Sequence, residues 1–203
     1  MAAVSRYLNW PGLVLASGSP RRRELLSAVG ADFTVIKPDV GEEIVAGEGP
    51  MQAARRLARD KAAWVHARHH GDRKHQLILA ADTLVVYRHH VLGKPRDGRD
   101  AARMLRLLSN NWHTVVTGVC LLDRASGRAV TAAECTRVKF RRLSPPLIAR
   151  YVASGEPLDK AGAYGIQRLG ALLVERVDGC YFNVVGLPLV RVAKLLERRA
   201  GRR

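Results

Sequence analysis

Three segments of the 203-residue chain carry side chains that could do chemistry. In the first, Ser17-Gly18-Ser19-Pro20-Arg21-Arg22, an apolar run that predicts a strand meets the start of a predicted helix. Small residues let the backbone approach a ligand, and the N–H groups of a helix start attract an anion. Two arginines in the first turn would add bidentate phosphate contacts. The segment indicates phosphate binding, with an ordinary capped helix and surface arginines as the alternative.

The second segment places a carboxylate, Asp82, inside the apolar run Leu77–Val86, which predicts a buried strand. Such a carboxylate is costly unless it is paired, hydrogen-bonded or bound to a metal. Buried carboxylates serve proteins as bases and as ligands for Mg²⁺. A strand-end cap, or an ion pair with an arginine, is the structural alternative. Because active residues of open α/β sheets gather at strand ends, we favour a functional role.

The third segment, Ser154–Gln167, combines small residues with two adjacent charges and could fold over a ligand. A plain surface loop is the alternative. Lys61 is a further anomaly, because it lies on the apolar stripe of a helix predicted over residues 51–67. Its ammonium group either snorkels to solvent or points into the fold. Neither G-x-x-x-x-G-K-[ST] nor G-x-G-x-x-G after a strand is present.

The elements that must position these residues mix strands and helices throughout the chain. Strands are predicted at residues 13–17, 33–36, 77–86, 114–122 and 129–140. Helices are predicted at about 20–29, 51–67, 99–108 and 144–154, and from Pro188 onward. Asp178-Gly179 predicts the turn of a hairpin. With no repeat and no linker, the pattern predicts one α/β domain, whose mixed, partly antiparallel sheet is flanked by helices.

Composition limits the classes of function. The net charge of +16 favours a polyanionic partner, such as nucleic acid, an acidic membrane or a phosphorylated small molecule. The basic residues are spread along the chain without interleaved aromatics, so no stacking platform for single strands is predicted. No apolar run is long enough to span a membrane, and no secretory signal is evident, so we expect a cytoplasmic protein. The 3 cysteines lack metal-ligand spacing and predict reduced thiols.

Taken in order, these segments resemble the Maf family of nucleotide pyrophosphatases. The resemblance is carried by residues 15–26, 57–62, 81–83, 93–95, 113–119, 151–167 and 183–189. It spans residues 13–196 and implies a single domain over 1–203 with a basic tail at 197–203. It also implies an elongated, two-lobed fold with a central cleft, similar to the inosine-triphosphate pyrophosphatases. The implied reaction is hydrolysis of a nucleoside triphosphate to the monophosphate and pyrophosphate, with Mg²⁺ or Mn²⁺.

Residue roles follow from the matching positions. Asp82 would be the general base and would share the metal with Glu42, although the register leaves Glu43 open as the second ligand. The residues that would bind the triphosphate are Ser17, Arg21, Arg22, Lys61 and Lys94. The sequence departs from the family pattern at two places. Asn110 replaces a usual Gly, but Asn tolerates a left-handed backbone. At residues 88–90 the usual turn signal is missing, so we expect a loose turn there.

Asp159–Gln167 and Thr83 resemble the branch of the family that acts on dTTP and UTP, in which Arg21, Thr83 and Gln167 would set specificity. A glutamine amide offers a donor and an acceptor together, as a pyrimidine edge requires. The alternatives are the sister branch, which acts on 7-methyl-GTP, and a basic nucleic-acid-binding regulator of septum formation. The regulator would bind duplex with a steep salt dependence, but no helix-turn-helix or zinc signature supports it. The resemblance also implies a homodimer.

Overall fold

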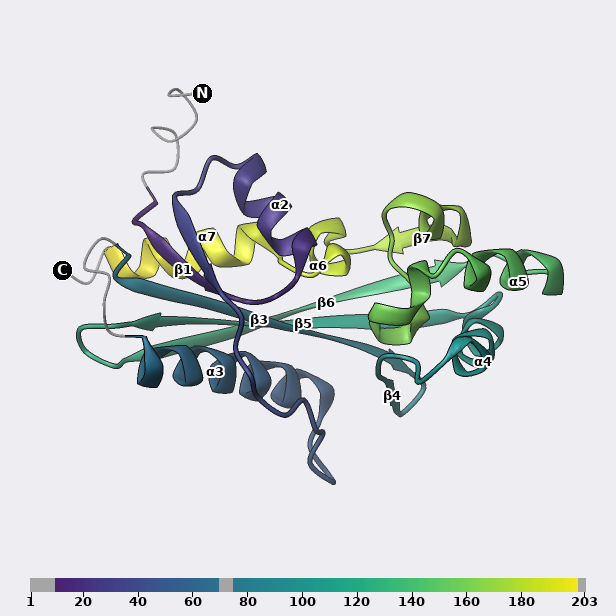
Figure 1. Ribbon diagram of the computed structural model, residues 1–203, viewed down its shortest axis with the longest axis horizontal. Helices are drawn as coiled ribbons and strands as arrows, with labels where there is room; N and C mark the ends of the chain where they lie inside the picture. The colour runs from purple at the N-terminus through teal and green to yellow at the C-terminus, as the bar shows by residue number, and fades with distance from the viewer. Residues whose placement is uncertain (1–9, 70–74, 201–203) are drawn as a thin grey trace. The chain divides into compact units, whose positions relative to one another are not determined.

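A computed structural model describes residues 10–69 and 75–200 of the chain (Figure 1). In this part of the chain, one sheet contains seven strands in the order β2-β1-β3-β5-β6-β7, with β4 paired to β3. The strands are β1 (Leu13–Ala16), β2 (Phe33–Ile36), β3 (Leu77–Tyr87), β4 (His90–Leu92), β5 (Trp112–Asp123), β6 (Ala129–Phe140) and β7 (Val174–Asp178). β1 runs parallel to β2 and β3, whereas β4 is antiparallel to β3 and β7 is antiparallel to β6. The predicted mixed, partly antiparallel sheet is confirmed.

The helices agree with the sequence prediction to within one or two residues in most cases. They are α2 (Pro20–Ala28), α3 (Pro50–Arg68), α4 (Gly98–Leu108), α5 (Pro145–Ala153), α6 (Tyr181–Val185) and α7 (Leu189–Ala200). Short 3₁₀ helices cover Glu156–Asp159 (η1), Ala161–Ala163 (η2) and Arg168–Leu173 (η3). None of the helices in the described ranges is long and apolar enough to cross a membrane.

The chain forms two compact units, in agreement with the two lobes that the family resemblance implies. The first contains the described residues of 1–82, 117–133 and 186–203, and the second contains 83–116 and 134–185. The long strands β3, β5 and β6 each contribute residues to both units.

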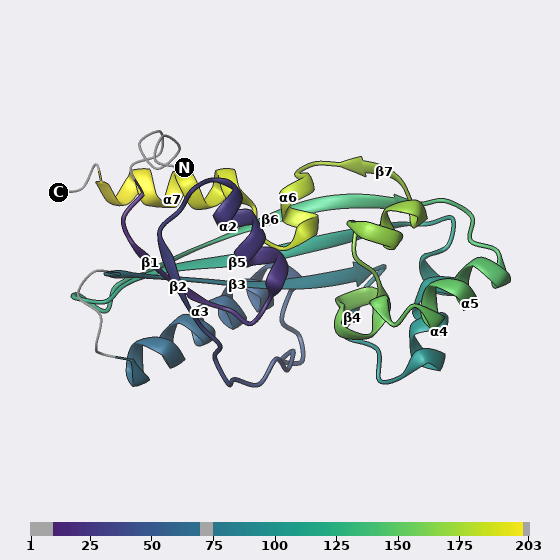
Figure 2. The ribbon, with the colours of Figure 1, turned by 45° about the horizontal axis from the view of Figure 1, so that its top comes forward.

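In the first unit, helices cover both faces of the sheet. α3 lies against one face, and α2 and α7 lie against the other (Figures 1 and 2). The α3 face packs Ala58, Ala62 and Val65 against Ile78 and Ala80 of β3. These helix positions follow the predicted spacing of three and four residues, and Pro50 begins the helix at a position where no N–H is needed.

In the second unit, α4 and α5 pack around a separate core. Its centre includes the fully buried side chains of Leu105, Leu108 and Phe140. The start of α4 is capped by Asp97, whose side chain accepts a hydrogen bond of 2.8 Å from the backbone N–H of Asp100. Such a cap satisfies one of the donors that a helix start leaves unpaired.

Two of the predicted turns are wrong. The chain does not form a hairpin at Asp178-Gly179, because helix α6 follows β7 and β7 pairs with β6 instead. Thr136 explains the difference, since its hydroxyl accepts from the backbone N–H of Cys180 at 3.0 Å and donates to the carbonyl of Cys180 at 3.1 Å. These bonds turn the chain away from a returning strand.

The second correction concerns the link between β3 and β4. Tyr87 pairs with His90, so the turn contains only two residues and is tight rather than loose. Arg88 adopts the required positive φ of 55° without a glycine. At Asn110, by contrast, the predicted left-handed backbone is confirmed, with a φ of 56°.

Gly118 of β5 allows α3 to approach the sheet closely. A Cβ atom at this position would overlap the backbone carbonyl of Ala54 and lie 2.6 Å from the backbone nitrogen of Arg55. We predict that Gly118→Ala lowers the free energy of unfolding by about 3 kcal/mol or more, because neither backbone can move aside easily. Urea denaturation measures the change. Gly41→Ala is the matched control, since its Cβ would meet nothing within 4 Å, and equal stability of the two variants would contradict the prediction.

Candidate active site

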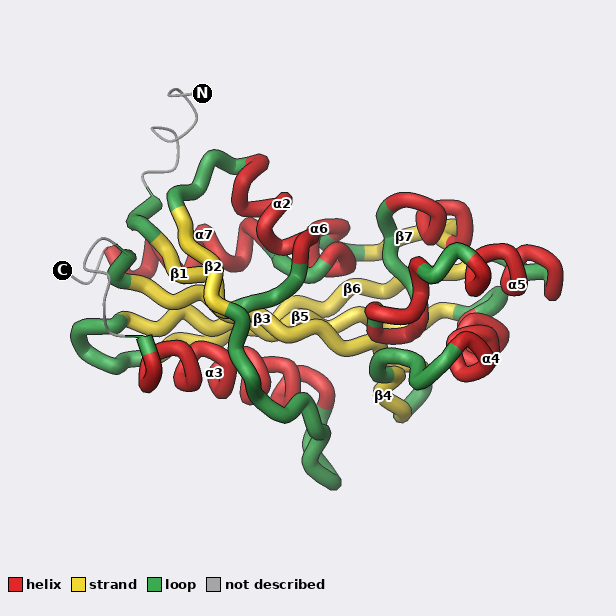
Figure 3. The backbone as a smooth tube through the Cα atoms, in the orientation of Figure 1, coloured by secondary structure: helices red, strands yellow, loops and turns green. Residues whose placement is uncertain are grey.

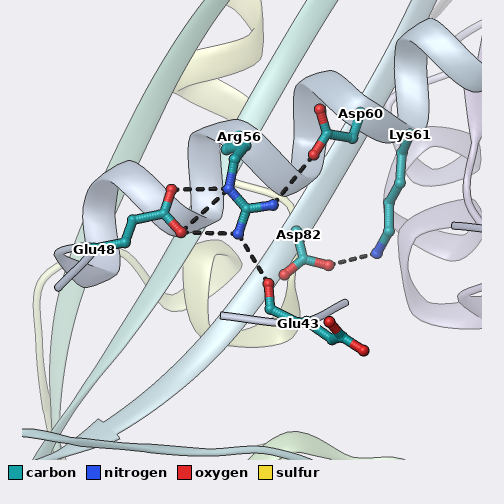
Figure 4. A network of polar contacts seen from close by, with 6 residues as sticks. All are labelled: Glu43, Glu48, Arg56, Asp60, Lys61 and Asp82. Carbon is teal, nitrogen blue, oxygen red and sulfur yellow. Dashed lines mark hydrogen bonds and ion pairs between the residues drawn. The ribbon is translucent and has the colours of Figure 1, made fainter. Parts of the chain in front are cut away.

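Lys61 and Asp82 form a buried ion pair between α3 and β3. Asp82 is 6% exposed and lies on the same face of β3 as Ile78 and Ala80, because strand side chains alternate. α3 covers that face, and its Lys61 Nζ donates a hydrogen bond to Asp82 Oδ1 (Figure 4). The Lys61 ammonium therefore points into the fold rather than snorkelling to solvent. Each charge offsets the cost of burying the other.

Glu42 brings a second carboxylate to the same ammonium group. Its Oε1 accepts a hydrogen bond of 2.6 Å from Lys61 Nζ, and its side chain is 46% exposed. Of the two glutamates between which the sequence left the register open, Glu42 is the one whose side chain contacts Lys61. Glu43 turns its backbone carbonyl toward α3 instead. Two carboxylates thus converge on one cation.

The β1–α2 junction adds a buried guanidinium group. Arg22 donates from Nη1 to Ser17 Oγ at 3.0 Å and from Nε to the carbonyl of Gly186 at 2.8 Å. Ser19 occupies the N-cap position of α2, but its side chain makes no capping bond. Its backbone N–H donates to Ser17 Oγ at 3.2 Å. Ser17 is therefore a central acceptor at this junction.

The charges of these groups act on one another. Burial lowers the pKa of Arg22, and the nearby Arg21 lowers it further. The carboxylates of Asp82 and Glu42 act in the opposite direction and favour the charged guanidinium. We refer to Ser17, Arg22, Glu42, Lys61 and Asp82 as the carboxylate–cation cluster. The cluster offers cations for phosphate oxygens beside a buried carboxylate that could accept a proton.

The other predicted site residues lie outside this cluster. Arg21 is half-buried in the first turn of α2. Lys94 is exposed after β4, Thr83 directly follows Asp82 in β3, and Gln167 is half-buried between η2 and η3. These last three residues belong to the second unit.

The segment that carries Gln167 is held by side chains whose roles the sequence analysis missed. The Glu156 carboxylate accepts from the hydroxyl of Tyr151 at 3.0 Å, from the backbone N–H of Gly170 at 3.1 Å and from that of Leu169 at 3.3 Å. Glu156 lies in the segment that the sequence singled out, but nothing in its spacing distinguishes it from a surface charge. Its partners are a tyrosine hydroxyl and two backbone N–H groups that folding brings near.

His113 holds the other end of this segment. Its Nε2 lies 2.7 Å from the hydroxyl of Tyr164, and both rings pack edge-to-face with Phe140. Burial lowers the pKa of His113 to about 3 and raises that of Tyr164. The imidazole is thus neutral at physiological pH and keeps an apolar core intact around Tyr164.

The cluster has the donor chemistry of a magnesium or manganese site. Glu42 and Asp82 supply hard carboxylate oxygens that already converge on a cation, the Lys61 ammonium. Mg²⁺ is commonly held by one or two carboxylates together with substrate phosphates. Within the described ranges, no group of three or more His, Cys, Asp or Glu side chains could hold a metal ion. The two carboxylates therefore fit a metal whose coordination includes oxygens of the substrate.

The chain is similar to known proteins over most of its length. Residues 12–199 match the family described as Maf-like protein. The dTTP/UTP pyrophosphatase of Syntrophomonas wolfei is 52% identical over 185 residues, which cover 91% of this chain and 96% of that protein. The dTTP/UTP pyrophosphatase of Koribacter versatilis is 49% identical over 196 residues, covering 97% and 98%. That of Acetivibrio thermocellus is 49% identical over 189 residues, covering 91% and 94%.

Among solved structures, the chain is similar to a nucleoside-triphosphatase, or dITP/XTP pyrophosphatase, from Mycobacterium abscessus. The TM-score is 0.40 and the sequence identity 17%, over 65% of this chain and 75% of that one.

The buried His113 predicts a pH dependence of stability. Its pKa is about 3 in the folded protein, against an ordinary value of 6.5. Below pH 6.5 the unfolded chain binds a proton that the folded protein does not, so stability is full above pH 6.5 and falls toward pH 3. The slope is at most about 1.4 kcal/mol per pH unit. Urea denaturation at pH 4–7 should show a shallower slope for His113→Gln than for the wild type. His89→Gln, at an exposed turn, is the control, and equal slopes in all three proteins would contradict the prediction.

Proposed function

This chain belongs to the Maf family, and on that premise we propose that it hydrolyses dTTP and UTP to the nucleoside monophosphate and pyrophosphate. The family match over residues 12–199 supports the reaction class. Relatives 49% and 52% identical over most of their length are named dTTP/UTP pyrophosphatases, which supports the substrates. The observation that carries the proposal is the carboxylate–cation cluster, in which a buried aspartate lies beside cations that suit a polyphosphate.

In this proposal Asp82 is the general base. Lys61 contacts its Oδ1, so Oδ2 is the oxygen that we assign to the attacking water. Asp82 orients that water and takes its proton as the water attacks in line, on the α-phosphorus. The bond between the α-phosphorus and the bridging oxygen then breaks, and pyrophosphate leaves.

Cationic side chains offset the charge that develops on the leaving pyrophosphate. We assign this role to Arg22 and Lys61 of the cluster, and to Arg21 and Lys94 from the family resemblance. Ser17 holds the Arg22 guanidinium in place through its hydroxyl. A bound Mg²⁺ or Mn²⁺, held by Glu42 and Asp82, would supply further positive charge at the phosphate oxygens.

Arg21, Thr83 and Gln167 are assigned to recognition of the pyrimidine nucleotide. Two features support the assignment of Gln167 to base recognition: its side-chain amide and the firmly held segment in which it lies. Two non-glycine residues with positive φ, Ala163 at 59° and Arg168 at 54°, flank it. Backbone strain of this kind persists where surrounding contacts fix a segment, and it is common at ligand-binding sites.

We also propose, from the family resemblance, that residues 1–203 act as one functional domain with a basic tail at 197–203, of which 201–203 lie outside the described residues. The same resemblance supports a homodimer whose ligand is the nucleotide. A cytoplasmic location is proposed from the sequence, in which neither a secretory signal nor a membrane span is evident. Binding of nucleic acid would be incidental to the charge of +16.

Replacement of Asp82 tests the base. We predict that Asp82→Asn lowers kcat for dTTP and UTP by about 10²- to 10⁴-fold, the range expected for loss of a general base. Pyrophosphate release with Mg²⁺ or Mn²⁺ measures the loss, and thermal unfolding verifies that the variant is folded. Asp178→Asn makes the same chemical change at an exposed position and should retain wild-type turnover. Near-normal kcat in Asp82→Asn would rule out the base.

The substrate panel in the same assay includes CTP, GTP and 7-methyl-GTP. Turnover of 7-methyl-GTP alone would keep the reaction and reject the assigned substrates. If folded wild-type protein with metal hydrolysed none of these nucleotides, the proposed function would be wrong, and salt-dependent binding to duplex DNA would be the property to measure next.

Replacement of Gln167 tests base recognition. We predict that Gln167→Ala raises KM for dTTP and UTP about tenfold, since one or two hydrogen bonds are lost, and changes kcat little. Steady-state kinetics on dTTP and GTP measure the effect. The ratio of kcat/KM for dTTP to kcat/KM for GTP should fall in the variant. An unchanged ratio would show that Gln167 does not contact the base.

A further inference from the structure

Arg56 makes a compact network on α3 that the proposed mechanism does not use. It lies five positions before Lys61 on the same helix (Figure 4). Its Nε donates to Glu48 Oε1 at 2.9 Å, and its Nη2 donates to Glu48 Oε2 at 2.8 Å. The Glu48 side chain is only 7% exposed. A two-pronged pair of this kind has a more specific geometry than an ordinary surface ion pair.

The same guanidinium group also holds the backbone beside Glu42. Nη2 of Arg56 donates to the carbonyl of Glu43 at 2.9 Å, and Nη1 contacts Asp60 Oδ2 at 3.3 Å. The hydrogen bond with Glu48 raises the pKa of Arg56 and lowers that of Glu48, so both groups stay charged. Arg56 thus links a helix to two points of one loop.

That loop needs such anchors because it has no regular structure of its own. Residues 37–49, between β2 and α3, contain no helix or strand (Figure 3). Glu42 lies in the middle of the loop, and its side chain contacts Lys61. A segment of this length would otherwise sample many conformations, and its ordering costs entropy that fixed contacts must offset.

We propose that Arg56 is a positioning residue that fastens the segment Glu43–Glu48 to α3 and thereby directs the Glu42 carboxylate toward Lys61 and Asp82. The two anchors of the loop, Arg56 and Lys61, belong to one rigid helix, so the position of Glu42 is tied to that of the catalytic base. The consequence for catalysis rests on the proposed function, whereas the fastening of the loop does not.

The fastening is tested by hydrogen–deuterium exchange in peptides that cover residues 39–48. Arg56→Met should speed exchange in these peptides, whereas exchange in β1 and β3 stays as in the wild type. Arg55→Met is the matched control, because Arg55 carries the same charge on the same helix and is exposed. Arg56→Met also leaves the Glu48 carboxylate without its arginine partner, so the double variant Arg56→Met/Glu48→Gln is measured as well. Wild-type exchange rates in both variants would overturn the proposal.

The catalytic consequence is tested by a double-mutant cycle between Arg56 and Glu42. Loss of a partner that orients a metal-binding residue commonly reduces activity or metal affinity about 10- to 100-fold. We expect Arg56→Met to lower kcat/KM for dTTP by such a factor, and to raise the Mn²⁺ concentration needed for half-maximal activity. In a Glu42→Gln background, the same substitution should change kcat/KM less than threefold.

Independent effects of the two substitutions would mean that Arg56 acts on stability and not through Glu42, which would overturn the positioning role. Arg56→Lys keeps the positive charge but cannot make the two-pronged contact of a guanidinium group. Its kcat/KM should therefore lie between those of Arg56→Met and the wild type. If the wild type hydrolysed no nucleotide, the proposed function would fail, and the exchange experiment alone would decide whether Arg56 fastens the loop.

Discussion

The burial of Asp82 is the constraint on which the rest of the site depends. A carboxylate inside an apolar strand needs a cation within reach, and here the cation comes from α3. Lys61 can reach Asp82 only because the helix lies close against the sheet. Small residues make this approach possible: Ala54, Ala58 and Ala62 line the helix, and Gly118 on β5 leaves room for the backbone of Ala54. Close packing and charge placement are therefore one feature of the structure.

The same helix organises the charged groups of the site in two ways. Lys61 neutralises part of the charge of Asp82 and Glu42, and Arg56 holds the loop from which Glu42 reaches in. Arg22 is a buried residue of α2. The carboxylates of Asp82 and Glu42 stabilise its positive charge. Cations from α2 and α3 thus compensate carboxylates from β3 and from the loop before α3. In the proposed function, a polyphosphate would meet charges that are already held in place.

The second unit provides order of a different kind. The segment that carries Gln167 is held by a neutral histidine, a buried tyrosine and a carboxylate that accepts from backbone N–H groups. Hydrogen bonds and ring packing surround a backbone that has positive φ at Ala163 and Arg168, and Lys160 adds an ion pair with Asp159. In the proposed function the cluster of the first unit binds phosphate, and Gln167 in the second unit is assigned to recognition of the base.

The sequence by itself determined five of the seven described strands, most helix boundaries and the residue types of the candidate site. Periodicity placed Lys61 on the buried stripe of α3 and Asp82 inside β3, and the ordered motifs identified the family. Only the tertiary structure decided that α3 covers the face of β3 to which Asp82 points, and that Glu42 rather than Glu43 reaches Lys61. It also replaced the expected hairpin at Asp178-Gly179 with α6, through bonds from Thr136. The physical reason is the distance along the sequence over which each interaction acts. Local periodicity reflects backbone geometry over a few residues. Charge pairs, and hydrogen bonds between side chains and backbone, join residues that are distant in the sequence.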